Sequence, residues 1–293
     1  MEFSVVIATR DRAAYLQHAL LSLQAQRGAP PFEIVVVDNG SSDGTRDLVE
    51  QFARGFESLH YVGWPLPNRG QARNRGVSVA AGRYLLFCDD DVELPEGWLA
   101  AHAAAHADAA PRVVNGPILN VPSYLSRPKP GPANYSRAFL CTCNASLPKA
   151  EFDAAGGFDE GFDLYGWEDT ELGLRLRAAG LQWKFSWDAY LWHVKLPEEA
   201  TLEVESRKAV ERARMARRFL ARHPSSRVRF ATGAHPLNVL RGRYLIPDGL
   251  LAMYAGLSTS RRVPGWLSAA ARAYFLDALY TRELVRELDA NHD

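Results

Sequence analysis

Three consecutive aspartates, Asp89, Asp90 and Asp91, follow an apolar run at residues 85–88 that has the composition of a buried strand. Adjacent carboxylates repel one another, so these three must either face water or hold a cation. Asp89 and Asp91 can point to the same side of an extended segment, and their hard oxygen atoms suit Mg²⁺ or Mn²⁺ carried in with a diphosphate. The simpler alternative is a solvated turn, in which aspartate is common.

The elements before these acids alternate between β-rich runs and helical periodicity. Strands are predicted at residues 3–8, 33–37, 59–62 and 85–88, with helices at about 15–23, 45–52 and 70–81. Such alternation with short loops is typical of an α/β fold with a mostly parallel central sheet flanked by helices. Asp38 ends the second strand as Asp89 follows the fourth, so we expect both acids at one edge of the sheet.

Residues 68–76 place three arginines and two asparagines where a loop meets a helix. A helix N-terminus combined with arginine is a fitting partner for a phosphate or a base edge. Neither of the usual glycine signatures for nucleotide binding occurs in the chain. Their absence argues against a dinucleotide-dependent enzyme and against a P-loop ATPase.

Four segments of the first third, residues 3–10, 35–45, 68–76 and 87–94, resemble the nucleotide-sugar half of inverting family 2 glycosyltransferases in order and spacing. The resemblance implies the GT-A fold, with a Rossmann-like nucleotide-binding half and an Asp-x-Asp metal motif. It also implies a nucleotide-sugar donor, UDP-linked by family frequency.

The resemblance assigns roles to individual residues. Thr9 and Asp38 are expected to hold the base and ribose, with Asn68 and Arg73 assisting. Asp89 is expected to contact the ribose or the metal, and Asp91 to bind the metal that bridges the diphosphate. The full set of nucleotide-binding candidates comprises Thr9, Arg10, Asp38, Asn68, Arg73, Asp89 and Asp90.

A second acidic group, Glu168 and Asp169, begins a segment with helical periodicity. Acids in a first helical turn are favoured by the helix dipole, which is the simpler explanation for them. The segment nevertheless resembles the Glu-Asp motif of the same family, which implies that Asp169 is the general base and that Glu168 orients the acceptor or the base. Trp167 beside them offers either a flat face for a sugar ring or ordinary core packing.

Histidines and a proline-rich loop complete the set of candidates. The resemblance makes His193 a candidate metal ligand, although a histidine on a Trp-rich strand is often a core residue. His102 and His106 are four residues apart with no third ligand nearby, so we expect them on the surface. Residues 117–135 carry five prolines and predict a mobile flap or a disordered insert, followed by a strand at 138–147.

The amino-acid composition limits which classes of protein this chain can belong to. A chain of 293 residues with 47% hydrophobic and 23% charged residues is typical of a globular protein with a sizeable core. Three cysteines cannot build a disulfide framework, so we expect reduced structural thiols and a cytoplasmic protein. The sequence predicts neither a secretory signal nor a membrane span.

The last third is basic and helical. Residues 201–293 hold 16 Lys and Arg against 9 Asp and Glu, whereas residues 1–200 hold 18 against 25. Long helices are predicted at 198–223 and 264–290. They could pack on the catalytic domain, pair two subunits as a homodimer, or lie on the inner face of a membrane. We divide the chain into a catalytic domain, 1–197 (donor half 1–95, acceptor half 96–197), and a helical region, 198–293.

The sequence therefore predicts a metal-dependent inverting glycosyltransferase that uses Mg²⁺ or Mn²⁺ and no nucleic acid. Its acceptor would be a hydroxyl group of a glycan, a lipid-linked molecule or a small molecule. One alternative is a sugar nucleotidyltransferase, but residues 9–12 lack the glycines of its phosphate loop. The other is an inactive binding module with this fold, against which the presence of both acidic groups argues.

Overall fold

The protein is described from a computed structural model that places residues 1–66, 68–108, 110–196, 201–260 and 262–290. The chain divides into two compact units. The first comprises Met1–Asp163 and Glu168–Leu196, and the second comprises Leu164–Trp167 and Pro197–Asp293. Each is described by itself below.

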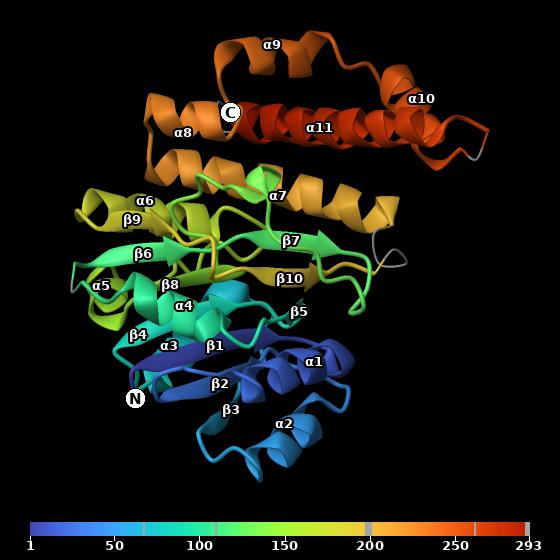
Figure 1. Cartoon of the computed structure of the whole chain (residues 1–293). Helices are drawn as coiled ribbons and strands as arrows, with labels where there is room; N and C mark the ends of the chain where they lie inside the picture. The colour runs from blue at the N-terminus through green and yellow to red at the C-terminus, as the bar shows by residue number, and fades with distance from the viewer. Residues whose placement is uncertain (67, 109, 197–200, 261, 291–293) are drawn as a thin grey trace. The chain divides into compact units, whose positions relative to one another are not determined.

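A seven-stranded sheet forms the centre of the first unit, in the order β3-β2-β1-β4-β8-β6-β9 (Figure 1). β8 runs antiparallel to both its neighbours, and the remaining pairs are parallel. The mostly parallel α/β fold predicted from the sequence is thereby confirmed. The strands are β1 (Phe3–Thr9), β2 (Phe32–Asp38), β3 (Leu59–Gly63), β4 (Tyr84–Cys88), β6 (Arg112–Asn115), β8 (Asn144–Pro148) and β9 (Gln182–Phe185).

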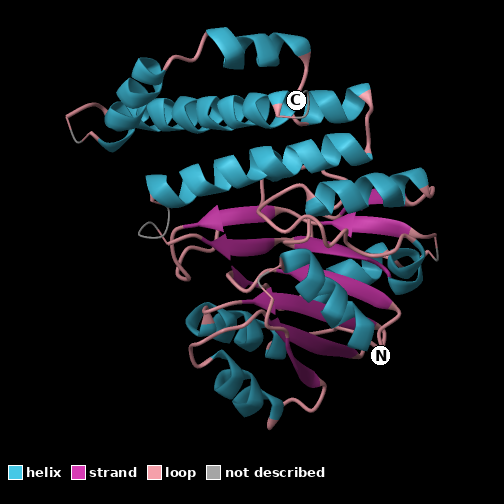
Figure 2. Cartoon of the chain, turned by 180° about the vertical axis from the view of Figure 1, so that it is seen from behind, coloured by secondary structure: helices cyan, strands magenta, loops and turns pink. Residues whose placement is uncertain are grey.

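Helices cover both faces of this sheet (Figure 2). Successive side chains of a strand point to opposite faces, so Val5 and Ile7 of β1 pack with α1, α2 and α4, whereas Val6 packs with α3, α5 and α6. Burial on both faces explains why these strands are continuously apolar in sequence. The helices are α1 (Ala13–Gln24), α2 (Thr45–Ala53), α3 (Arg69–Val79), α4 (Trp98–Ala105), α5 (Lys149–Ala154) and α6 (Glu168–Ala178).

A second, three-stranded sheet has the order β5-β10-β7. Its strands are β5 (Val92–Glu93), β7 (Ile118–Val121) and β10 (Leu191–Val194), and a 3₁₀ turn, η1, spans Pro132–Asn134. β7 lies inside the proline-rich segment, so the prediction of a structureless loop there is wrong at its start. β7 pairs in parallel with β10, and that partner lies about seventy residues away in the chain, beyond the reach of local patterns. The strand predicted at 138–147 starts later, at Asn144.

The second unit is helical, with α7 (Leu202–Arg222), α8 (Ser226–Ala231), α9 (Pro236–Tyr244), α10 (Asp248–Thr259) and α11 (Gly265–Asp289). α7 packs along α11, and both bury apolar residues such as Phe219 and Leu284. Thr201 caps α7 by accepting a hydrogen bond from the Val204 N–H, while the predicted start at residue 198 lies outside the described residues. Among the helices of the described segments, none is both long and apolar enough to cross a bilayer.

Candidate active site

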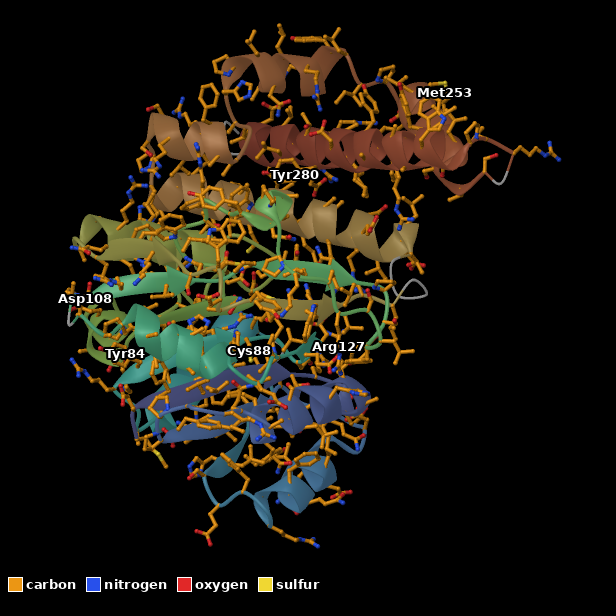
Figure 3. All side chains as sticks on the ribbon, viewed as in Figure 1. Tyr84, Cys88, Asp108, Arg127, Met253 and Tyr280 are labelled. Atoms are coloured by element: carbon orange, nitrogen blue, oxygen red, sulfur yellow. The ribbon has the colours of Figure 1, made fainter. Side chains whose placement is uncertain are left out.

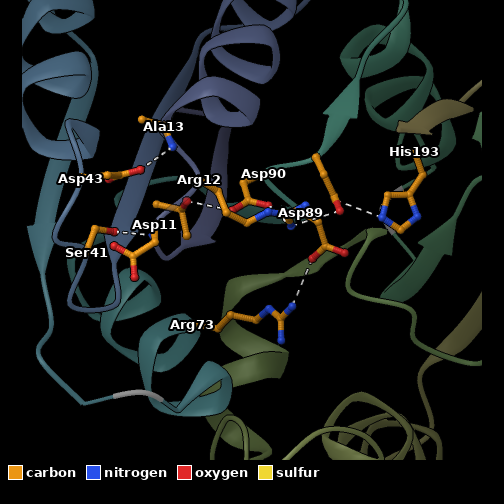
Figure 4. Close-up of polar contacts among 11 residues, drawn as sticks. Asp11, Arg12, Ala13, Ser41, Asp43, Arg73, Asp89, Asp90 and His193 are labelled. Atoms are coloured by element: carbon orange, nitrogen blue, oxygen red, sulfur yellow. Dashed lines mark hydrogen bonds and ion pairs between the residues drawn. The ribbon is translucent and has the colours of Figure 1, made fainter. Parts of the chain in front are cut away.

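The carboxyl ends of three adjacent strands, β2, β1 and β4, meet at one edge of the sheet. The register pairs Thr9 with Asp38, and Asp89 follows directly after the end of β4. The loops after β1 and β2 are joined by hydrogen bonds, because Asp43 accepts from the Ala13 N–H and Ser41 Oγ accepts from the Asp11 N–H (Figure 4). The Asp11 carboxylate also accepts from Ser42 N and Oγ. This edge therefore carries two loops, joined by hydrogen bonds, beside the aspartates.

Asp90 is buried, and its carboxylate is hydrogen-bonded to other residues of the protein. Its carboxylate accepts hydrogen bonds from Thr9 Oγ1 at 2.7 Å and from Arg12 Nη1 at 2.9 Å. Burial raises the pKa of Asp90 to about 7, against the opposing charge of Arg12. Thr9 and Asp90, both predicted to bind nucleotide, thus bind each other. Arg12 was missed from the sequence, although a cation just after a strand ending at the predicted site is a usable signal.

The other nucleotide candidates divide into engaged and exposed residues. Asp38 accepts from the Ser41 N–H and from the Tyr61 hydroxyl, both at 2.8 Å. Asn68 caps α3 by accepting from the Gln71 N–H, and its Nδ2 donates to the Glu160 carbonyl. Arg10 is exposed. Asp38 and Asn68 therefore order the loops of this edge, and their contacts with a nucleotide stay predictions.

Asp91 faces a histidine from the small sheet. Nε2 of His193 lies 3.0 Å from Oδ1 of Asp91, and Arg12 Nη1 lies 3.1 Å from Oδ2 (Figure 4). Burial would raise the pKa of Asp91, but His193 and Arg12 outweigh it and lower this pKa to about 2. β10 brings His193 here, because His193 pairs with Val92 in the antiparallel β5–β10 ladder. The structure thus brings His193 to the aspartates, as the metal assignment requires.

Arg73 connects the two acidic groups. Its Nη2 lies 3.3 Å from Oδ1 of Asp89, and its Nη1 lies 3.5 Å from Oε1 of Glu168. The Arg73 side chain is buried, reaching these carboxylates from α3. A single guanidinium therefore holds the acid group after β4 beside the acid group at the start of α6.

Asp169 is the second residue of α6. Burial, followed by the charge of Glu168, raises the pKa of Asp169 to about 6, while Arg73 opposes this shift. Its Oδ1 accepts a hydrogen bond from the Thr170 N–H at 2.7 Å. A carboxylate with such a pKa can accept a proton near neutral pH.

Trp167 does not have the surroundings of a sugar platform. Its ring is 7% exposed, packs on Phe219, and lies under the Arg212 guanidinium, whose carbon is 4.7 Å from the ring centroid. The indole Nε1–H donates to the Arg212 carbonyl. Within the second unit, the Trp167 ring is packed and its indole N–H is hydrogen-bonded. We therefore assign Trp167 a structural role in place of the predicted acceptor contact.

The prediction of surface histidines at 102 and 106 is wrong. His102 is fully buried and His106 is 5% exposed, and both contact Ser146 Oγ, at 2.9 and 2.8 Å. His102 Nε2 also lies 3.0 Å from Asn144 Oδ1. The alanine-rich sequence of α4 has no apolar stripe that would indicate which face of the helix is buried. Packing against the sheet alone determines which face is buried.

Several polar atoms at this edge are buried without a hydrogen-bond partner among the described residues: Asp91 Oδ1, Glu168 Oε2, Arg73 Nη1 and Asn39 Oδ1. Buried polar atoms are rarely left unpaired in native proteins. Carboxylate oxygens with an imidazole nitrogen are also ligands that divalent cations accept. The residues present therefore fit a cation together with a polar ligand.

Comparison with known sequences agrees with this geometry. The glycosyl transferase family 2 profile matches residues 4–146, and the profile described as the N-terminal domain of galactosyltransferase matches residues 124–218. The chain belongs to glycosyl transferase family 2. A relative, validoxylamine A glucosyltransferase from Streptomyces hygroscopicus subsp. limoneus, is 32% identical over 262 residues, covering 76% of this chain. The chain spans 57% of the length of that relative.

Solved structures show that this family 2 chain has the GT-A fold. The mannosyltransferase PcManGT from Pyrobaculum calidifontis, in complex with GDP-Man and Mn²⁺, has a TM-score of 0.62 at 18% identity, covering 96% of this chain and 86% of that one. TarS 1–349 from S. aureus, in complex with UDP-GlcNAc, has a TM-score of 0.59 at 20% identity, with 100% and 92% covered.

Proposed function

We propose that the protein is a metal-dependent inverting glycosyltransferase that transfers a sugar from a nucleoside diphosphate donor to a hydroxyl acceptor. We infer a UDP-sugar as the donor, in line with the TarS complex, with GDP-sugars as the comparison set in any assay. Residues 1–95 would bind the donor and residues 96–197 the acceptor.

The position of Arg73 carries this proposal. Direct displacement needs a proton acceptor close to the acids that hold the leaving diphosphate. Arg73 contacts both Asp89 and Glu168, which is adjacent to Asp169, so the base candidate and the cation candidates share one edge of the sheet. An arrangement with the two acidic groups on separate faces would be unsuitable for this reaction.

The chain's own residues support a single displacement. Asp169 accepts the proton of the acceptor hydroxyl, whose oxygen bonds to the anomeric carbon as the bond from that carbon to the diphosphate oxygen breaks. One displacement inverts the anomeric configuration and needs no covalent nucleophile. Arg73 holds Asp89 and Glu168 in place, and Arg12 holds Asp90 and Asp91.

Asp89, Asp91 and His193 are the residues that would hold the divalent cation. When bound, such a cation supplies stabilisation of the negative charge that develops on the leaving diphosphate. Asp90 has both oxygen atoms engaged by Thr9 and Arg12, so we place it as a support for the loop after β1.

The experiment is a panel of UDP- and GDP-sugars incubated with Mn²⁺ and the purified protein, scored by release of the nucleoside diphosphate. Asp169→Asn should lower turnover by roughly 10²–10⁴-fold while leaving donor affinity unchanged, because only the proton acceptor is lost. Asp163→Asn, which neutralises an exposed acid shortly before α6, is the matched control and should keep full turnover. Full turnover by Asp169→Asn would disprove the assignment of the base. Conversion of the nucleotide sugar and added pyrophosphate into a nucleoside triphosphate and a sugar 1-phosphate would indicate a nucleotidyltransferase.

A further inference from the structure

A cysteine lies among the proposed cation ligands. Cys143 comes directly before β8, and the antiparallel register pairs its neighbour Asn144 with Cys88 at the end of β4. Cys143 therefore lies beside Asp89, the residue that follows Cys88. β10 adds His193 through its pairing with β5, so three separate strands meet at this point.

The ligand atoms of these residues are close enough to share one ion. Sγ of Cys143, a carboxylate oxygen of Asp89 and a ring nitrogen of His193 all lie within 4.8 Å of one another. Cys143 is 8% exposed, and its thiol is not in a disulfide. The group offers one sulfur, one nitrogen and one oxygen ligand.

An independent observation points to a ligand at the same place. Asp91 is 8% exposed, and its buried Oδ1 has no hydrogen-bond partner among the described residues, although it lies 3.0 Å from Nε2 of His193. This carboxylate oxygen and the imidazole nitrogen that it faces form a pair of ligand atoms that divalent cations accept. A cation between these side chains would bind both atoms.

We propose that Cys143 is a ligand of the divalent cation, together with Asp89 and His193, and that the site prefers borderline metals such as Co²⁺ and Zn²⁺ over Mg²⁺. The location of the cation rests on the proposed function, but metal binding can be measured without any sugar donor. A thiolate favours softer metals, whereas an all-oxygen site favours Mg²⁺ or Mn²⁺. Sulfur coordination releases the thiol proton to solvent.

Titration with Co²⁺ tests the ligand directly, since bound thiolate gives a near-ultraviolet sulfur-to-cobalt charge-transfer band. The wild-type protein should develop this band in proportion to bound Co²⁺, and Cys143→Ser should lose it. Cys141→Ser removes a thiol two residues away and should keep the band. A band that persists in Cys143→Ser, or wild-type Co²⁺ binding without any band, would overturn the proposal.

Affinity provides a second readout. Cys143→Ser should weaken Zn²⁺ binding, which can be measured by competition with a chromogenic chelator. Loss of a residue that only supports a metal ligand lowers metal affinity by roughly 10- to 100-fold, so loss of a direct ligand should lower it by at least as much. Mg²⁺ or Mn²⁺ affinity should change much less, because serine keeps an oxygen at the position. Equal losses for Zn²⁺ and Mg²⁺ would overturn the proposed preference. Donor turnover that is absent in every variant, with the cobalt band present, would reject the transferase function and keep the metal site.

A different observation, in the second unit, carries a second inference. α9 packs on α11 through Gly242, where an added Cβ would lie 2.8 Å from Val285 and 2.9 Å from Thr281. Its opposite face presents Leu237, Leu240 and Tyr244, which are 77%, 55% and 68% exposed. These positions follow helical spacing, so they form one continuous apolar stripe, which we name the α9 face.

The surroundings of the α9 face are apolar and positively charged. Other exposed large apolar residues of this unit include Phe230, Leu245, Met253 on α10 (Figure 3), and Trp266. The sequence from 222 to 262 contains seven arginines and a single acidic residue, Asp248; the two arginines of α9, Arg241 and Arg243, also pair with Asp277 and Asp289 of α11. Apolar and aromatic side chains mixed with arginine are typical of helices that lie in the headgroup region of a bilayer.

We propose that the α9 face docks on the surface of an anionic lipid bilayer. Charge complementarity favours this occupant over a second copy of the chain, because two such arginine-rich faces would repel each other. The apolar stripe would enter the headgroup boundary while the arginines contact lipid phosphates.

Co-sedimentation with vesicles tests this surface. The protein should pellet with vesicles containing phosphatidylglycerol, and not with pure phosphatidylcholine, and added salt should weaken the binding. The triple variant Leu237→Ser, Leu240→Ser, Tyr244→Ser should stay in the supernatant with an unchanged melting temperature, since all three side chains are exposed. Leu21→Ser, at an exposed position of α1, is the control. Unchanged vesicle binding by the triple variant, or a wild-type dimer that ignores vesicles, would overturn the proposal.

Discussion

At the scale of single residues, three consecutive aspartates have three different environments. Asp89 pairs with Arg73, Asp90 is enclosed by Thr9 and Arg12 with a pKa raised to about 7, and Asp91 faces His193 with a pKa lowered to about 2. The same side chain therefore takes separate roles because burial and neighbouring cations differ from one position to the next. This division leaves Asp89 and Asp91 as the cation ligands.

Asp169 should impose a pH dependence on turnover. Its pKa is raised to about 6 by burial and by the charge of Glu168, and only the ionised form can accept a proton. Turnover at saturating donor should therefore rise by about tenfold per pH unit below about pH 6 and level off above it. The measurement is initial nucleotide release against pH, with Asp169→Asn expected to lose this rise. A flat wild-type profile across pH 6 would contradict the assignment.

At the scale of elements, the fit of α4 and β8 depends on a buried polar network. Asn144 Oδ1 accepts from the Trp98 indole N–H and faces His102 Nε2, which must therefore carry the proton. Nδ1 of His102 then accepts from Ser146 Oγ, and His106 Nε2 donates to that hydroxyl. Within this network of described residues, only the Nδ1 atom of His106 lacks a hydrogen-bond partner. The network thus requires both histidines to be neutral.

Neutral buried histidines predict acid-sensitive stability. Burial lowers the pKa of His102 to about 4 and that of His106 to about 3, below the value of 6.5 for an unperturbed histidine. The unfolded chain then binds more protons than the folded one below pH 6.5, so stability is full above that pH and falls as pH decreases toward 4. We expect the free energy of unfolding in urea to fall by about 2 kcal/mol per histidine between pH 7 and pH 5.

The matched variants for this pH effect are His102→Gln and His18→Gln. The first removes one buried imidazole and should reduce the pH dependence, even if it lowers stability at pH 7. The second alters an exposed histidine of α1 and should leave the slope unchanged. Equal slopes in all three proteins would show that the acid sensitivity has another source.

α3 carries Arg73, and Gly76 on the same helix sets the distance between α3 and the sheet. A Cβ at Gly76 would lie 2.7 Å from Val6 Cγ1 and 2.8 Å from Val37 Cγ2. Gly76→Ala should therefore lower the free energy of unfolding by about 1–3 kcal/mol through overpacking. Gly249→Ala in α10, where nothing lies within 4 Å, should instead stabilise by up to about 1 kcal/mol. Urea denaturation of both variants decides this, and stabilisation by Gly76→Ala would refute the tight packing.

At the scale of the whole molecule, cation and donor binding should be linked. If the cation joins the aspartates to the diphosphate, each ligand raises the affinity for the other. UDP at 100 times its dissociation constant should add about 2.7 kcal/mol to stability in Mn²⁺, seen as a rise in melting temperature. EDTA, or Asp91→Asn, should remove most of this rise. If UDP raised the melting temperature equally with and without EDTA, no cation would bridge the aspartates and the diphosphate.

The local sequence determined the elements of the first unit and the two acidic groups. Continuous apolar runs fixed the strands from β1 to β4, and parallel alternation placed Asp38 and Asp89 at one edge, because strand direction follows from the helices between strands. Local periodicity also predicted α7 and α11. It did not give α8, α9 and α10, because Pro224, Gly233, Pro236 and Gly242 interrupt the periodicity of that stretch.

Only the tertiary structure decided which side chains meet. The antiparallel entry of β8 beside β4 brings Cys143 to Asp89, and the β5–β10 pairing brings His193 to Asp91. The same packing buries His102 and joins Asp89 to Glu168 through Arg73. Such contacts join residues from about 16 to more than 100 positions apart, and their register follows from burial of whole faces, which no local pattern encodes.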